Sequence, residues 1–202
     1  ATLHGLCELI ERDATTLWIA QGGPEHAATR LALDSVDDRA CRLVLERFAT
    51  AEVEVLVWET TTDVGVPSFL CEVADRDGVS FRPLGPQRGM GCHPRREIAL
   101  LRALTEAAQA RLTVISGARD DLAARTYDQA LDERARQRFF GYAAGKPTRR
   151  FVDAPTFDSD DLNQDLTWCC TKLAAAGMPK IVWVDLSRPG WPISVVRVVV
   201  PG

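Results

Sequence analysis

Two long helical patterns, separated by strand patterns, limit the fold of this 202-residue chain more than any other feature. Apolar residues recur at helical spacing over 1–20 and again over 94–115, where Pro94 suits a first turn and Gly117 follows the end. Further helices are predicted from Ser35 or Asp34 to 49, at 131–142, and from 159 to Gly177. Strands are predicted at 53–60, 67–74, 180–185 and 193–200. The order α-α-β-β-α-α-α-β-β favours an α+β fold, a mixed or antiparallel sheet layered with long helices, over a regular βαβ fold.

Several details of this layout are specific enough to test. Residues 75–78 form a turn signal that allows a short third strand at 79–82, and the Pro- and Gly-containing segment 83–91 is predicted to be a loop. The apolar runs at 181–184 and 195–200 indicate strands near the centre of a sheet. Residues 145–150 form either a lid or an exposed connection. The predicted inward stripe of the long helix is Ile98, Leu101, Leu104 or Thr105, Ala108, Leu112 and Ile115.

Composition excludes several classes of protein. The length suits a single domain over 1–202, and 46% hydrophobic with 26% charged residues is typical of an ordinary globular chain. A net charge of −4 and a pI near 5.4 provide no basic surface for nucleic acid or an anionic membrane, and no apolar stretch is long enough to span one. The six cysteines lack CxxC spacing, so we expect buried free thiols and a cytoplasmic location.

The polar side of the opening helix contains the candidate site. Glu8, Glu11 and Arg12 lie on adjacent turns and share a polar window opposite the apolar stripe. Two carboxylates with a guanidinium can hold Mg²⁺ and a phosphate together, because Mg²⁺ uses one or two carboxylates plus phosphate oxygens and Arg pairs bidentately with phosphate. The alternative is a solvated face on which Glu8 and Arg12 form a surface ion pair.

Three motifs occur in a fixed order along the chain: residues 5–14 (GLCELIERDA), residues 89–112 (GMGCHPRREIALLRALTEAAQARL, followed by SGARDD at 116–121) and residues 195–202 (VVRVVVPG). Together they resemble the C-terminal part of a YcaO domain. The chain begins inside a helical pattern without an initiator Met, so we expect a fragment of a larger YcaO-type domain whose N-terminal part is absent, and expect it to be inactive alone.

The resemblance implies an ATP-dependent enzyme that O-phosphorylates a peptide backbone amide before a nucleophile attacks. It assigns Glu8 and Glu11 as ligands of Mg²⁺ and Arg12 as a nucleotide contact. The family uses a further arginine from the long-helix region, and the sequence leaves three candidates. Arg102 and Arg111 are candidate catalytic residues, and Arg119 is a second candidate for nucleotide binding.

In the reaction that the resemblance implies, the nucleophile determines the product. A Cys or Ser side chain of the peptide or protein substrate gives an azoline, and external sulfide gives a thioamide. The C-terminal motif is more similar to members found beside TfuA partners, and other members are described as accessory factors for ribosomal protein methylthiolation. The contrasting hypothesis is a non-catalytic module that binds a peptide or partner, and an exposed apolar face would favour a homodimer.

Three other features have both a functional and a structural interpretation. The segment Gly89–Pro94 could present backbone N–H groups to an anion or could simply form a tight loop. His93 suits a general base or a helix cap, and Arg102 with Glu106 suits an intrahelical ion pair. Arg197, a charge within an apolar strand, is expected to form a buried pair with Asp185 or to face substrate.

Overall fold

A three-stranded antiparallel sheet forms the centre of the protein. The structure is a computed structural model that describes residues 1–25, 27–76, 84–117, 119, 121, 127 and 131–201. The strands β1 (Val53–Glu59), β2 (Ser68–Asp75) and β3 (Gln87–Cys92) lie in the order β1-β2-β3. In the register of β1 and β2, Val53 pairs with Asp75 and Glu59 with Phe69, and β3 pairs with β2 so that Cys92 lies opposite Ser68.

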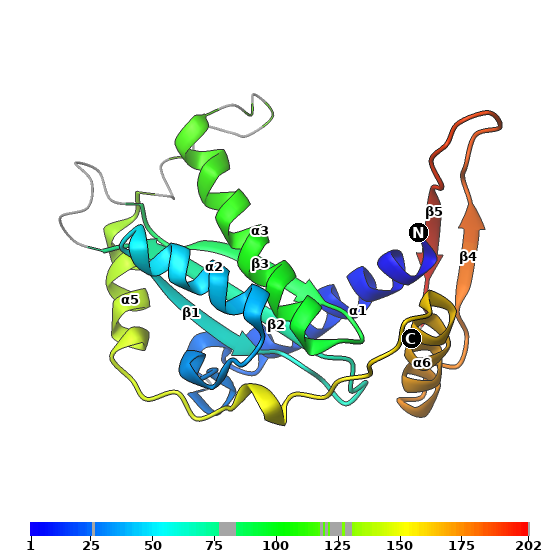
Figure 1. Ribbon diagram of the computed structural model, residues 1–202, viewed down its shortest axis with the longest axis horizontal. Coiled ribbons are helices and arrows are strands. Elements are labelled where there is room, and N and C mark those ends of the chain that lie inside the picture. Colours follow the sequence, from blue (N-terminus) through cyan, green and yellow to red (C-terminus); the bar gives the residue numbers. More distant parts are fainter. Residues whose placement is uncertain are drawn as a thin grey trace.

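Two helices cover one face of this sheet. These are α2 (Arg39–Thr50) and α3 (Arg96–Ser116), which lie side by side over the strands in Figure 1. Alternate strand residues point into this layer, as the two-residue period of a strand requires. The resulting core includes Phe48, Val55, Val57, Phe69, Val73, Leu100 and Leu104.

The opposite face is covered by the end of α1 (Thr2–Ala20) and by α5 (Glu133–Ala143). Trp18 from α1 and Phe139 from α5 are buried there with Trp58 of β1, and the two indole rings lie 5.7 Å apart. Short 3₁₀ turns occupy Gly23–Glu25, Ala27–Thr29, Leu33–Ser35 and Phe151–Asp153.

A second cluster forms at the start of α1, at the far right of Figure 1. Here α6 (Leu162–Ala175) and an antiparallel ribbon of β4 (Val182–Asp185) and β5 (Val196–Val199) pack against α1. Leu6 and Cys7 of α1 meet Cys169 and Leu173 of α6 and Val198 of β5. The helix α1 therefore connects this cluster to the cluster around Trp18 and Trp58 on the sheet.

The predicted α+β class and the predicted helices are confirmed, with one strand added to the order. Residues 87–92 form β3, so the prediction of a loop over 83–91 is wrong for its second half. The glycines that suggested a turn instead allow a helix to approach the strand, as described below. The predicted turn at 75–78 and strand at 79–82 fall mostly outside the described residues.

Two details of the helices differ from prediction. Asp38 caps α2, because its Oδ1 accepts a hydrogen bond from the Cys41 N–H at 2.9 Å, and neither Ser35 nor Asp34 does so. The predicted inward stripe of α3 is confirmed at Leu104, which is buried, and at Leu101 and Ala108, which are half-buried against the core, and it is wrong towards the end of the helix. Leu112 is 62% exposed, and the helix instead buries Ala99, Leu100, Ala103, Leu104 and Ala107.

The two C-terminal strands are not central. They form a separate ribbon whose β4 is exposed along its whole length, with Trp183 at 60% exposure, because no other described strand or helix covers its outer face. Arg197 is exposed and lies opposite Val184, and the Asp185 carboxylate accepts the Ser187 N–H at 2.8 Å. The predicted buried pair between Arg197 and Asp185 is therefore wrong.

The cysteines and the segment 145–150 agree with the expectations from the sequence. All six cysteines are free thiols, five of them buried and Cys170 half-buried. The segment 145–150 connects α5 to the rest of the fold and pairs through a single bridge between Leu31 and Arg149. None of the described helices combines the length and apolarity needed to cross a membrane.

Candidate functional site

The helix α3 lies against β3 because small residues face one another. A Cβ placed on Gly91 would lie 2.1 Å from the Ala99 carbonyl oxygen, and one on Gly89 would lie 2.2 Å from the Ala107 nitrogen. Both glycines are therefore required by the close approach of the helix backbone, and the expectation that residues 89–92 form a loop is wrong, because they belong to β3. This close packing fixes the position of Arg102 on α3 relative to the sheet.

The two predicted metal ligands of α1 occupy different environments. Glu11 is only 2% exposed and its Oε2 has no hydrogen-bond partner, whereas the Glu8 side chain is 53% exposed. Glu8 and Arg12 are 3.8 Å apart, which is the predicted surface ion pair. On this side of α1, the exposed pair of Glu8 and Arg12 therefore lies within one turn of the buried Glu11 carboxylate.

Arg102 of α3 lies close enough to Glu11 to act on its charge. Its Nη1 is 3.2 Å from Nδ1 of His4, a residue of α1, so the guanidinium is held between the two helices. Glu106, one turn further along α3, also acts on Glu11, and the ion pair expected between Arg102 and Glu106 does not form. His4 was not anticipated, because an exposed His near the chain start has no distinguishing sequence signal.

Burial raises the pKa of the Glu11 carboxyl above its ordinary value. Loss of hydration is the main cause, and the nearby Arg102 opposes it while the negative Glu106 adds to it. Arg12 and the backbone of Cys92 also favour the charged form, without overcoming the cost of burial. Glu11 is therefore a buried carboxylate whose negative charge its neighbours compensate only in part.

The other two candidate arginines are engaged elsewhere. Arg111 donates from Nε to the buried carboxylate of Asp75 at 2.9 Å, and Arg119 pairs with Asp121 on the surface. Neither acts on Glu11, so the described structure brings only Arg102 of the three together with Glu8, Glu11 and Arg12. Spacing in the sequence could not separate the three arginines, because the choice depends on how α3 lies beside α1.

His93 forms a local hydrogen bond in the turn before α3. Its Nδ1 accepts a hydrogen bond from the Arg95 N–H at 3.0 Å, just before the start of α3. Burial lowers the pKa of the His93 imidazole, which favours the neutral ring that can accept this bond. Because the bonded N–H belongs to Arg95, the residue before α3, and α3 has no side-chain cap, His93 stabilises the turn that leads into the helix and is not its cap.

The donor set at the site fits Mg²⁺ only in the presence of a further ligand. Among the described residues there is no group of three or more His, Cys, Asp or Glu side chains arranged to hold a metal. Glu8 and Glu11 supply hard oxygen donors, and Oε2 of Glu11 is a buried oxygen without a partner. Because Mg²⁺ is commonly held by one or two carboxylates plus phosphate oxygens and water, these residues fit a metal that arrives with a nucleotide.

We expect Glu11→Gln to stabilise the protein at pH 7.5 by about 1–2 kcal/mol. The substitution removes a buried negative charge that the neighbouring arginines compensate only in part. The raised pKa means that protonated Glu11 stabilises the fold below its unfolded-state pKa, and that this contribution is lost as the pH rises through the folded-state pKa. The gain should therefore shrink toward zero near pH 4. Urea unfolding of both proteins at the two pH values measures it.

The matched control is Glu8→Gln, which neutralises a largely exposed carboxylate on the same helix and should change stability by less than about 0.5 kcal/mol. A Glu11→Gln protein less stable than the parent at pH 7.5 would show that Glu11 is already satisfied in the folded state.

Comparison with known proteins shows which family this chain resembles along its whole length. A family model described as YcaO cyclodehydratase, ATP- and Mg²⁺-binding, matches residues 1–202. An uncharacterized protein in the tfuA 3′ region of Rhizobium leguminosarum bv. trifolii is 36% identical over 205 residues, covering 100% of this chain and 49% of that protein. The chain spans about half the length of the curated relatives that it matches over its whole length.

Two solved structures are similar along the whole chain. One is a heterocyclase in complex with substrate and cofactor, with a TM-score of 0.76, 26% identity, and coverage of 100% of this chain and 26% of that one. The other is the heterocyclase TruD, with a TM-score of 0.74, 28% identity, and coverage of 99% and 27%.

Proposed function

Because this chain belongs to the YcaO family, we propose that it contributes part of the nucleotide and metal site of an enzyme that uses ATP to activate a peptide backbone amide. Its fold is that of a YcaO cyclodehydratase-like domain and is similar to heterocyclase structures. The observation that supports the proposal best is the meeting of buried Glu11 with Arg102, beside exposed Glu8 and Arg12.

Each residue of this group has a role that follows from its environment. Glu8 and Glu11 would hold Mg²⁺, which would neutralise the negative charge of the phosphates. Arg12, exposed on the same helix, contacts the nucleotide, and Arg102 donates to the oxygens of the transferred phosphoryl group as charge develops on them. His4 holds the Arg102 guanidinium between α1 and α3.

The proposed reaction has two steps. The amide oxygen of the substrate forms a bond to the γ-phosphorus, and the bond from that phosphorus to the leaving ADP breaks. A nucleophile then attacks the activated amide carbon, and inorganic phosphate leaves with the former amide oxygen. A Cys or Ser side chain of the substrate would yield an azoline, and sulfide would yield a thioamide.

We propose the thioamide product and a TfuA-like partner protein. The support is the tfuA-region relative, which matches the chain from end to end, together with the C-terminal motif at 195–202. The substrate is then a peptide or protein whose backbone amide accepts the phosphoryl group before sulfide attacks.

Calorimetric titration of ATP with Mg²⁺ into the full-length protein tests the role of Arg102. We expect Arg102→Ala to lower the affinity about 10- to 100-fold, the usual effect of losing a charged hydrogen bond to phosphate. Arg119→Ala, which breaks only a surface pair, should leave the affinity unchanged. Equal affinity in the parent and in Arg102→Ala would remove Arg102 from the nucleotide site and favour a non-catalytic binding module.

A further inference from the structure

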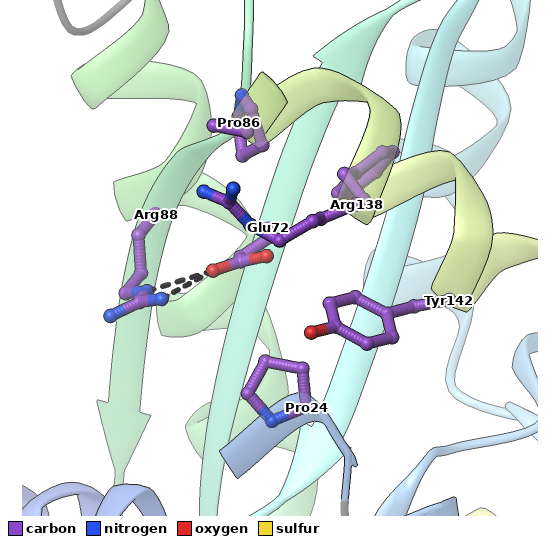
Figure 2. Close-up of a pocket in the computed structure, with 8 residues that line it drawn as sticks. Pro24, Glu72, Pro86, Arg88, Arg138 and Tyr142 are labelled. Atoms are coloured by element: carbon purple, nitrogen blue, oxygen red, sulfur yellow. Dashed lines mark hydrogen bonds and ion pairs between the residues drawn. The ribbon is translucent and has the colours of Figure 1, made fainter. Parts of the chain in front are cut away.

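A pocket on the side of the sheet opposite α3 has no role in the reaction described above. It is formed by β2, β3, α5 and the 3₁₀ turn that follows α1, and its volume is about 360 Å³. Its lining residues are Pro24, Glu72, Pro86, Arg88, Ala135, Arg138, Phe139 and Tyr142. Figure 2 shows the pocket with Pro86 and Pro24 at opposite ends and the polar side chains between them.

On the strand side of the pocket, Glu72 and Arg88 form an ion pair with each other. Glu72 of β2 and Arg88 of β3 are register partners, and Nε of Arg88 donates to Oε1 of Glu72 at 3.1 Å, with a second bond from Nη2. The Glu72 side chain is buried and that of Arg88 is about half exposed. The charge of Glu72 is therefore neutralised by Arg88, and the pair adds no net charge to the pocket.

The helix side contains two donors that nothing in the described structure uses. Arg138 and Tyr142 lie one turn apart on α5, and their side chains point into the pocket in Figure 2. Neither the Arg138 guanidinium nor the Tyr142 hydroxyl has a hydrogen-bond or ion-pair partner among the described residues. The pocket therefore has one uncompensated positive charge and a free hydroxyl.

We propose that this pocket binds the carboxylate of an Asp or Glu side chain of the peptide substrate. Arg138 would form a bidentate ion pair with the carboxylate, and the Tyr142 hydroxyl would donate a third hydrogen bond. One carboxylate matches the net charge of +1 left by Arg88, Arg138 and Glu72. The identification of the ligand as a peptide rests on the proposed function, whereas the carboxylate chemistry rests on the pocket alone.

The shape of the pocket agrees with a single inserted side chain. A volume of about 360 Å³ lies at the lower end of the range for small-ligand sites, which is too small for a folded partner. The methylene groups of Glu or Asp would contact Phe139 and the two prolines, while the peptide backbone stays outside. The pocket would thus select a substrate by an acidic residue distant from the modified amide.

Binding can be measured without nucleotide, which separates this proposal from the proposed function. The probes are acetyl-Gly-Glu-Gly-amide and its Gln counterpart, titrated into the full-length protein in 0.15 M salt and followed through the arginine Nε–H NMR signals. We expect the Glu peptide to shift the Arg138 signal and to bind at least about tenfold more tightly than the Gln peptide. Equal binding of the two peptides would overturn the proposal.

The variants distinguish a defined site from general charge attraction. Arg138→Ala should reduce affinity for the Glu peptide about tenfold or more, and Tyr142→Phe, which retains the ring, about threefold. Arg134→Ala removes an exposed arginine four residues away on the same helix that does not line the pocket, and it should have no effect. Equal losses in the Arg134 and Arg138 variants would contradict a specific pocket.

A free acid is the other source of the same chemistry. Glutarate has the carboxylates without a peptide, and we expect it to bind at least about tenfold more weakly than the Glu peptide. If glutarate binds as tightly, the pocket is a site for a small carboxylic acid and the peptide proposal is wrong. Unchanged affinity for ATP with Mg²⁺ in Arg138→Ala would confirm that this pocket and the nucleotide site are separate.

Discussion

Replacing Gly91 with alanine is expected to destabilise the protein by about 3–5 kcal/mol, enough to prevent folding of a marginally stable domain. The added Cβ would lie 2.1 Å from the Ala99 carbonyl oxygen and 2.7 Å from the Ala103 nitrogen. Both atoms belong to the backbone of α3, so no side-chain rotation relieves the clash. The helix must move away from β3, and the midpoint of urea unfolding measures the cost.

The same displacement should separate Arg102 from Glu11, so any folded Gly91→Ala protein should bind ATP with Mg²⁺ more weakly than the parent. Gly141→Ala is the matched control. A Cβ on Gly141 of α5 meets nothing within 4 Å, and alanine is favoured over glycine in a helix by up to about 1 kcal/mol. The control should be slightly more stable than the parent. A loss below about 1 kcal/mol for Gly91→Ala would show that α3 is not held this closely.

Local sequence patterns predicted the helices and the first two strands because those elements are determined by apolar periodicity. The spacing of Leu6, Ile10 and Ala14 is enough to orient α1, and each of these residues is buried. The strand patterns at 53–60 and 67–74 likewise identified β1 and β2 within one residue at each end.

The errors occurred where one element depends on another. Gly89 and Gly91 have the composition of a turn, yet they pair with β2 as part of a strand. Their lack of side chains is explained by the close approach of α3. The stripe of α3 was predicted from its largest apolar residues, yet the helix buries alanines because β3 offers glycines. The apolar runs of β4 and β5 predicted burial at the centre of a sheet, yet no described element covers β4, and its residues are exposed.

The candidate site was predictable only in part. Helical spacing placed Glu8, Glu11 and Arg12 together, since the three residues share one helix. The burial of Glu11 and the proximity of Arg102 are tertiary features, which arise because α1 and α3 meet near the end of β3. No local pattern distinguishes Arg102 from Arg111, whose partner Asp75 lies on β2.

The second large effect concerns the two carboxylates of α1. We expect the Glu8→Ala/Glu11→Ala double variant to bind ATP at least about 100-fold more weakly in the presence of Mg²⁺. The reason is that a metal without these two oxygen donors no longer joins the phosphates to the protein. The variant should remain folded and gain stability at neutral pH, because it loses the buried charge of Glu11. Calorimetric titration of ATP into the full-length protein gives the affinity, and urea unfolding gives the stability.

The most direct test of a metal and nucleotide site on α1 is how much Mg²⁺ changes the affinity for ATP in that titration. The parent and the double variant are each titrated with ATP, once with Mg²⁺ and once with a chelator. The control is Asp37→Ala/Glu46→Ala, which removes two exposed carboxylates, one just before α2 and one on it. We expect Mg²⁺ to strengthen ATP binding in the parent and the control and to have little effect in the double variant. An equal Mg²⁺ effect in all three proteins, or no ATP binding by any, would contradict a metal and nucleotide site on α1.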